Sequence, residues 1–383
     1  MQAPAAPLAL TGVRVLDLTE LLPGPFATQM LADMGAEVVK IERPGRGDNA
    51  REMLPGTYRM VNRGKQSVTL NLKTAEGREA LVRLAKKADV LVEGYRPGVM
   101  KRLGVDYETL AQWNPGLVYA SISGFGQSGP LRDVPGHDLN YNAVAGVLAL
   151  CGRPDGPPEH TVGVPIADLS ASLYTVTSIL AALMLRQKTG KGQYLDVSIT
   201  DAVFTLVGPR LGSAQDDPAF SKKDILCRAG YGVYETSDKR HIAVGAVEDH
   251  FWERLVKVLA IPSLADPRYA RSAQRWKATD QLEPAIRAKI RERTHDEWIE
   301  TLTSNDVPVT TVTGLEGVLD DPYLNARGMV LQGNGIRYLN YPVPMAGVDA
   351  ARHSGTRELG ADNQAVLADA GYSPQQIAAL GKG

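Results

Sequence analysis

Short apolar runs rich in β-branched residues alternate with helical stretches through the first half of the chain, and glycine turns separate them. Strand, helix and strand joined by short turns is the pattern of a parallel sheet with helices on its faces. We therefore expect an α/β fold. The expected strands are residues 13–18, 37–42, 67–72, 90–93, 117–122 and 193–200, and the expected helices include 75–87 and 169–186.

The pattern changes after about residue 205. Residues 234–247 hold two β-like runs around a polar turn at 237–240, which predicts a hairpin. Amphipathic helices are expected at 251–259, 280–291 and 296–302. The expected domains are a large lobe at 1–205 and 328–383, a smaller α+β lobe at 226–325, and linkers at 206–225 and 326–327.

The charges nearly balance, with 42 basic and 43 acidic residues, which argues against nucleic acid or a membrane surface as a partner. Two cysteines, Cys151 and Cys227, cannot build a disulfide framework and fit a reducing compartment. The first ten residues lack the positive charge of a secretory signal, and no apolar run is long enough to span a bilayer. We expect a cytoplasmic protein without a metal site, because no His/Cys cluster has metal-ligand spacing.

Residues 124–129 match the pattern G-x-G-x-x-G and follow an expected strand. A dinucleotide site would need a helix to open directly after this pattern, so that its N–H groups meet the pyrophosphate. Pro130 and the stretch 134–136, Val-Pro-Gly, follow instead. The sequence therefore predicts a glycine-rich loop beside an active site.

Two short segments carry titratable groups into apolar surroundings: residues 136–141, which include His137, and residues 166–170, which include Asp168. A histidine and a carboxylate that converge on one cavity can pass a proton between them, or the carboxylate can attack an activated acyl group. Both groups also lie at expected helix starts, where Asp138 and Asp168 are plausible N-caps. The residues alone leave these alternatives open.

Glu248 follows an expected strand and a glycine, where an acidic residue is common at the start of a helix. Several basic residues fall at strand ends or loops of the first lobe, where ligands of open parallel sheets bind: Arg43, Lys73, Arg96, Lys101 and Arg102. Arg43 and Arg96, each beside a Pro-Gly turn, are the better candidates for binding phosphate groups. For Lys101 we expect a solvated surface position.

Several segments together resemble the class III CoA-transferase (CaiB/BaiF) superfamily. The opening block consists of residues 14–18, 24–25, 31–44 and 47–48, and the likeness continues through 65–73, 92–104, 188–193 and 321–330. The resemblance covers nearly the whole chain, and its opening block is long enough to be specific.

The resemblance implies an interlocked homodimer, in which each chain forms a ring threaded by the other. A Rossmann-like large lobe would be built from both chain ends, and the active site would lie between this lobe and the small lobe of the partner. It implies an acyl-CoA substrate and no cofactor beyond its CoA moiety. Gly94 departs from the transferase branch, which often has asparagine there. The implied CoA-binding residues are Arg43, Leu70, Lys73, Tyr95, Arg96 and Arg102.

Two chemistries share the scaffold that this resemblance implies, and Asp168 matches the functional aspartate of both. In the transferase branch the aspartate is a nucleophile that forms an anhydride while CoA changes owner. In the branch resembling α-methylacyl-CoA racemase, an aspartate and a histidine act as two bases. Residues 136–141 and 245–248 are closer to the racemase. Residues 156–158 and 162–168 fit the transferase as well as they fit the racemase. Asp249 stands where racemases often carry proline.

The expected function is therefore racemisation of a 2-methylacyl-CoA or similar thioester by 1,1-proton transfer between His137 and Asp168. Glu248, from the partner chain, would hold the tautomer of His137. A backbone N–H at the start of the Asp168 helix would stabilise the enolate oxygen. The alternative is CoA transfer between carboxylic acids, with Asp168 as covalent nucleophile.

Overall fold

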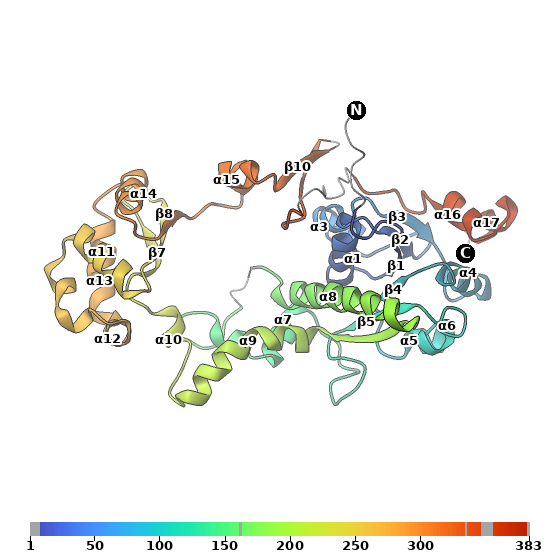
Figure 1. The fold of residues 1–383 in the computed structure, drawn as a ribbon, viewed down its shortest axis with the longest axis horizontal. Helices are drawn as coiled ribbons and strands as arrows, with labels where there is room; N and C mark the ends of the chain where they lie inside the picture. Colours follow the sequence, from blue (N-terminus) through green and yellow to red (C-terminus); the bar gives the residue numbers. More distant parts are fainter. Residues whose placement is uncertain (1–7, 161–162, 334, 346–354, 381–383) are drawn as a thin grey trace. The chain divides into compact units, whose positions relative to one another are not determined.

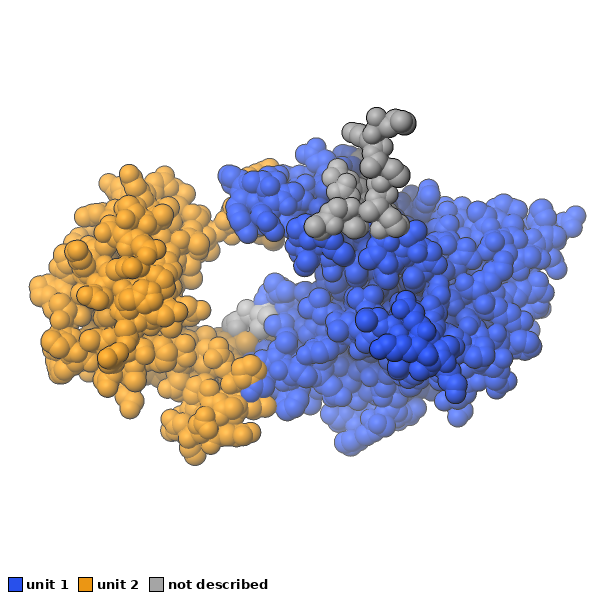
Figure 2. Space-filling model, viewed as in Figure 1, with its two compact units in different colours: residues 1–147, 162–208, 322–383 blue, residues 148–161, 209–321 orange. Residues whose placement is uncertain are grey.

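The computed structural model describes residues 8–160, 163–333, 335–345 and 355–380 (Figure 1). Most of the residues on which the expectation about a secretory signal rests lie outside these ranges. The chain divides into two compact units (Figure 2). Unit 1 comprises residues 1–147, 162–208 and 322–383, and unit 2 comprises residues 148–161 and 209–321.

Unit 1 is built on a parallel sheet of six strands in the order β3-β2-β1-β4-β5-β6. Val15 of the central strand pairs with Val38 on one side and Val90 on the other. The expected α/β class and parallel sheet are confirmed. The strands are β1 (Arg14–Leu18), β2 (Glu37–Glu42), β3 (Gln66–Thr69), β4 (Val90–Glu93), β5 (Val118–Ser123) and β6 (Gln193–Ser198).

Helices pack on both faces of this sheet, because successive side chains of a buried strand point to opposite faces and both sets are apolar here. Val15 and Val92 face one helical layer, and Leu16 and Leu91 face the other. The first layer holds α1 (Pro23–Asp33), α7 (Asp138–Val144), α8 (Ile166–Thr189) and the first half of α9 (Ile199–Asp216). The second holds α4 (Ala75–Ala85), α5 (Val99–Leu103), α6 (Tyr107–Leu110), α16 (Asn363–Asp369) and α17 (Pro374–Leu380).

The C-terminal segment returns to the edge strand β3, so both chain ends contribute to unit 1. Asp362 accepts a hydrogen bond from the backbone N–H of Ser67 (2.9 Å), and the side-chain oxygen of Asn363 accepts one from the N–H of Thr69 (2.8 Å). These bonds satisfy donors that an edge strand would otherwise expose. The returning segment also contains α15 (Pro322–Ala326) and the antiparallel strands β10 (Val330–Gly333) and β11 (Ile336–Leu339).

Helix α8 is long and apolar enough to cross a membrane by length and composition alone. Half of its most apolar stretch is buried inside the structure, and Ala171, Ile179 and Leu183 pack into the core beneath the sheet. A core helix passes the same test, so this single helix is weak evidence for a membrane span.

Unit 2 is a small α+β unit around an antiparallel sheet of three strands, β7 (Tyr231–Glu235), β8 (His241–Gly245) and β9 (Val309–Thr311). Alternate strand residues such as Tyr234 and Ile242 pack against Trp252 and Trp298 in its core. Those tryptophans come from α11 (Asp249–Leu259) and α14 (His295–Ser304), and α13 (Thr279–Ile290) adds Ile286 to the same core.

Three boundaries differ from the sequence-based expectation. Residues 322–327, expected in the small lobe and the second linker, belong to unit 1. Residues 148–161, expected in the large lobe, belong to unit 2, because Lys222 Nζ donates to the carbonyl oxygens of Cys151 (3.0 Å) and Pro157 (2.9 Å). The expected linker at 206–225 is largely helical, since α9 continues to Asp216. The chain therefore passes between the units inside a helix, which a search for loop residues does not detect.

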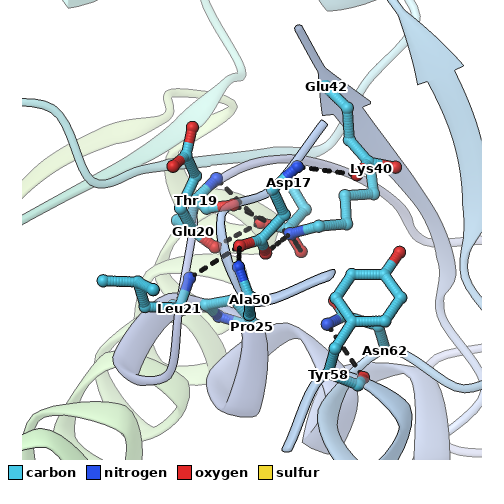
Figure 3. A network of polar contacts seen from close by, with 12 residues as sticks. Asp17, Thr19, Glu20, Leu21, Pro25, Lys40, Glu42, Ala50, Tyr58 and Asn62 are labelled. Atoms are coloured by element: carbon cyan, nitrogen blue, oxygen red, sulfur yellow. Dashed lines mark hydrogen bonds and ion pairs between the residues drawn. The ribbon is translucent and has the colours of Figure 1, made fainter. Parts of the chain in front are cut away.

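Four charged side chains lie almost fully buried beside β1 and β2: Asp17, Lys40, Asp48 and Lys65, each at most 2% exposed. Lys65 Nζ lies 2.9 Å from Asp17 Oδ2, and Lys40 Nζ lies 2.9 Å from Asp48 Oδ2. Figure 3 shows Asp17 and Lys40 from close by. Lys65 also donates to Thr28 Oγ1 at 2.7 Å, which ties the middle of α1 to the sheet.

Burial by itself raises the pKa of Asp17, but the attraction of Lys40 and Lys65 outweighs it and holds the pKa well below its usual range. Burial lowers the pKa of Lys65 to about 8, although Asp17 opposes this change. Both pKa values are therefore lowered, that of Asp17 by its lysine partners and that of Lys65 by burial. Charges removed from water in this way depend on each other for stability.

Replacing Lys65 with Met is expected to lower the free energy of unfolding by about 3–5 kcal/mol, because it leaves Asp17 buried without its nearest cation. The matched control is Lys87→Met, which removes an exposed lysine paired with Asp369 and should cost at most about 1 kcal/mol. Urea unfolding followed by circular dichroism measures both. Equal effects of the two substitutions would contradict this assignment.

Candidate active site

A cavity of about 600 Å³ opens at the carboxyl edge of the six-stranded sheet. The loops after β1, β4 and β5 line it, together with the starts of α7 and α8. Its position follows from the strand order, because the chain moves outward in opposite directions from β1 and β4. Ligands of open α/β sheets bind at such a switch point, where the loops of neighbouring strands diverge.

The loop after β1 is held against the sheet by the buried charges. Asp17 Oδ1 accepts a hydrogen bond from the N–H of Thr19 (3.0 Å), and Asp48 Oδ1 accepts one from the N–H of Leu21 (3.0 Å). Leu21 has a φ of 66°, a left-handed conformation that is strained for a leucine and needs such support. A Cβ at Gly24 would lie 2.3 Å from the Cβ of Thr19, so only glycine fits there.

The loop after β4 is positioned by a buried carboxylate. Glu93 Oε2 accepts a hydrogen bond from the N–H of Tyr95 (2.7 Å), and the hydroxyl of Ser121 donates to Oε1. Burial raises the pKa of Glu93 to about 7. Tyr95 and Arg96, both predicted to bind CoA, line the cavity from this loop.

Residues 124–137 form a loop, so the G-x-G-x-x-G pattern opens no helix. The ring of Tyr141 packs against two glycines of this loop, Gly124 and Gly136. A Cβ at these positions would lie 2.5 Å and 2.7 Å, respectively, from the Tyr141 ring. The hydroxyl of Tyr141 donates to the carbonyl oxygen of Gly136 at 2.6 Å. These contacts place the next residue, His137, at the N-cap position of α7.

His137 is exposed and lines the cavity together with Asp168. Its backbone N–H donates to Asn140 Oδ1 at 3.0 Å, which ties it to the first turn of α7. The structure therefore brings the two predicted catalytic side chains to one cavity.

Asp168 lies in the first turn of α8, after the N-cap residue Pro165, and is not itself the N-cap. Asp138 caps this helix from α7, because its Oδ1 accepts hydrogen bonds from the N–H groups of Ala167 (2.8 Å) and Asp168 (3.1 Å). The expectation that Asp138 caps its own helix is wrong. The N–H groups of Ala167 and Asp168 are two of those expected to be open to an enolate oxygen, and Asp138 accepts from both of them.

The pKa of Asp168 is raised to about 7, first by burial and second by the negative charge of Asp138. Neither cause involves a cation. Burial raises the pKa of Tyr141 to about 12, and the negative charge of Asp168 adds to this rise. Asp168 is therefore a partly buried, unusually basic carboxylate that lines a ligand-sized cavity.

Four predicted CoA-binding residues are not among those that line the cavity. Leu70 is 1% exposed and packs in the core after β3. Lys73 and Arg102 are exposed in unit 1. Arg43 lies behind the lining residues Glu20 and Asn49, with its Nη2 3.2 Å from Glu20 Oε1 and 3.0 Å from Asn49 Oδ1.

Glu248 belongs to unit 2, where it is exposed at the N-cap position of α11 and makes no side-chain cap hydrogen bond. Its expected pairing with His137 stays a prediction. Arg132 is a polar residue of the cavity lining that sequence reasoning missed, and Asp138 was expected only as a cap of its own helix. The only signal for Arg132 was its place just after the glycine pattern. Within the described ranges, no group of three or more His, Cys, Asp or Glu side chains is arranged to hold a metal ion.

Residues 10–363 match a family model described as CoA-transferase family III. The chain belongs to CoA-transferase family III.

An acetyl-CoA:oxalate CoA-transferase of Acetobacter aceti is 36% identical over 348 residues, which cover 88% of this family III chain and 89% of that protein. A human succinyl-CoA:glutarate CoA-transferase is 32% identical, with 84% of this chain and 76% of that protein covered. A crystal structure of a CaiB/BaiF family protein from Brucella suis matches with a TM-score of 0.86 at 30% identity, covering 95% of this chain and 100% of that one. These relatives favour the transferase alternative over the racemase that the sequence predicts.

Replacing Asp138 with Asn is expected to lower the pKa of Asp168, because a neutral side chain no longer disfavours the ionised form. The amide oxygen of Asn can still accept from the N–H of Ala167, so the cap is retained. Carbon-13 NMR titration of the aspartate carboxyls measures the pKa. Asp133→Asn removes another carboxylate of the cavity lining and serves as the control, since Asp133 has no part in the shift. An unchanged pKa in Asp138→Asn would refute the electrostatic coupling.

Proposed function

We propose that this chain transfers CoA between carboxylic acids, with Asp168 as covalent nucleophile. The observation that carries the proposal is the environment of Asp168. Its carboxylate lines the cavity, is made more basic by burial and Asp138, and has no cation among the causes of its shift. Basic carboxylates freed from ion pairs are stronger nucleophiles than solvated ones.

The proposed reaction needs no group besides CoA. An oxygen of Asp168 attacks the thioester carbonyl carbon. The C–S bond breaks, CoA leaves as a thiolate, and an acyl-aspartyl anhydride remains on the enzyme. The thiolate attacks the Asp168 carbonyl, which releases the first acid as carboxylate and leaves CoA as a thioester on Asp168. The second acid reverses these two steps and regenerates the free carboxylate. No net proton is taken up or lost.

The ionised form of Asp168 is the attacking species in this reaction. Because the pKa of Asp168 is about 7, the rate of anhydride formation should rise with pH through that value and then level off.

The named relatives act on oxalate and glutarate, so we propose short dicarboxylic acids as the substrate class.

Racemisation is the second candidate function, because His137 and Asp168 line one cavity and both are needed as bases. Two observations weigh against it. The N–H groups of Ala167 and Asp168 at the start of α8, two of the donors expected for an enolate oxygen, are bonded to Asp138. The curated relatives named above are CoA-transferases.

We also propose the interlocked homodimer that the family resemblance implies. It is supported by large apolar side chains that α8 and α9 leave exposed in unit 1, because contiguous exposed apolar patches mark interaction surfaces. These side chains are Leu173, Tyr174, Met184, Leu185, Phe204 and Leu206, each 43–65% exposed.

Incubation with succinyl-CoA and no acceptor acid is expected to leave an adduct on Asp168, detectable as a mass shift of the intact protein and lost in Asp168→Asn. His137→Ala should keep the adduct, whereas a two-base racemase would lose a factor of roughly 10²–10⁴ in rate without this histidine. The matched assay follows the α-proton of a 2-methylacyl-CoA in D₂O by NMR. Exchange of that proton without an adduct would establish the racemase instead.

Phe204→Glu is expected to shift the protein from dimer to monomer in sedimentation velocity, because it places a charge in the apolar surface of α9. Trp113→Glu is the control, since Trp113 is also exposed (57%) but lies against Lys86 on the other helical layer. A wild-type protein that sediments as a monomer at micromolar concentration would refute the dimer.

A further inference from the structure

Three hydrogen-bonded side chains connect the loop after β4 to the loop after β5, behind the residues that line the cavity. They are Glu93 at the end of β4, Ser121 of β5 and Gln127 of the glycine-rich loop. The hydroxyl of Ser121 donates to Glu93 Oε1, and Gln127 Nε2 donates to Ser121 Oγ at 2.9 Å. Glu93 and Ser121 are paired in the register of the two parallel strands, so the sheet itself sets the first contact.

Each end of this connection holds a residue of the cavity lining. Glu93 Oε2 accepts a hydrogen bond from the N–H of Tyr95 at 2.7 Å. At the other end, the carbonyl oxygen of Gln127 accepts one from Nε of Arg132 at 3.0 Å. Tyr95 and Arg132 line the cavity from the two loops, whereas Glu93 is a buried residue behind them. Glu93 can therefore influence the site through both loops.

Glu93 is buried without a cation. It is 4% exposed, and its partner on β1, Leu18, is apolar. No lysine, arginine or histidine contributes to its shift, and burial raises its pKa to about 7. The titratable groups that interact with it electrostatically are phenols from the loop after β4, from β5 and from β6: Tyr95, Tyr119 and Tyr194. Its carboxyl group therefore changes its protonation state near neutral pH.

The two protonation states of Glu93 hold the loops with different strength. The ionised carboxylate accepts from Tyr95 and Ser121 together, and hydrogen bonds to an ionised acceptor are roughly twice as strong as neutral ones. A protonated carboxyl has a proton to donate, and Ser121 Oγ can accept it whereas the N–H of Tyr95 cannot. The bond to Ser121 then reverses, and both contacts of Glu93 lose the contribution of its charge.

We propose that Glu93 is a positioning residue that couples the loops after β4 and β5, and that its ionised form holds Tyr95 and Arg132 in place for the CoA thioester. The inference rests on the proposed function only in requiring a CoA thioester as ligand. The proposed nucleophile, Asp168, lies on α8 and is held by Asp138 from α7, so its chemistry does not depend on this connection.

A role in packing alone is the competing explanation. A side chain that only filled space could be replaced by glutamine without loss, because the two side chains have the same shape. Glu93→Gln keeps an acceptor for the N–H of Tyr95 and a donor for Ser121 Oγ, but it cannot ionise. The two explanations therefore differ in the pH dependence of ligand binding.

The first test is isothermal titration of the full chain with CoA between pH 5.5 and 8.5, with and without Glu93→Gln. Both proteins also carry Asp168→Asn, so that the nucleophile does not titrate. We expect the ratio of the two CoA affinities to rise with pH up to about 7 and then level off, because Glu93 ionises over that range. The ratio should reach roughly five to ten, the difference between a charged and a neutral hydrogen bond. Taking the ratio cancels the titration of the phosphate groups of CoA.

The second test is hydrogen exchange of the loops, measured by mass spectrometry on peptides that cover residues 94–98 and 124–133. Glu93→Ala should speed exchange in both loops, and Glu93→Gln should restore most of the protection. The matched control is Asp89→Asn at the opposite end of β4, where Asp89 accepts from the N–H of Arg14 at 2.8 Å. This control should leave exchange in both loops unchanged.

A ratio of affinities that does not change with pH would overturn the proposal, and so would faster exchange in only one of the two loops of Glu93→Ala. A chain that shows the expected pH dependence of CoA binding but transfers no CoA in its wild-type form would overturn the proposed function and leave the role of Glu93 standing.

Discussion

The buried ion pair between Lys65 and Asp17 is the interaction on which the position of the site depends. It joins the residue before β3 to β1 in the interior, and Lys65 also donates to Thr28 in the middle of α1. Asp17 in turn holds the N–H of Thr19, the first residue of a loop that lines the cavity. Charges so deeply buried are costly unless every partner is present. Any other conformation of the loop after β1 would break the hydrogen bond between Asp17 and the N–H of Thr19.

A second carboxylate, Asp138, links the two helices that carry the catalytic candidates. One of its oxygens caps α8, and its charge raises the pKa of Asp168. One side chain therefore holds the start of the helix that carries the proposed nucleophile, and it adds to the larger effect of burial on the pKa of Asp168. It also accepts from the N–H groups of Ala167 and Asp168, two of the donors expected for an enolate oxygen.

The preference for a racemase arose from residues 136–141, where His137 and Asp138 match the signature of that branch. The structure shows that much of this segment serves the framework: Asp138 caps α8, and Tyr141 packs against Gly124 and Gly136. A local motif of this kind does not reveal whether its polar atoms are free for chemistry. That depends on partners about thirty residues away, such as the N–H of Ala167.

The sequence by itself determined the α/β class and the strands of the parallel sheet, because apolar periodicity and glycine turns are local signals. A large lobe built from both chain ends was implied by the family resemblance. The sequence also singled out His137, Asp168, Tyr95 and Arg96, which share the cavity. Only the tertiary structure decided that Asp138 caps another helix and that Arg43 pairs with Glu20. Those contacts join residues distant in the chain, and they follow from the order of the strands, which local periodicity does not encode.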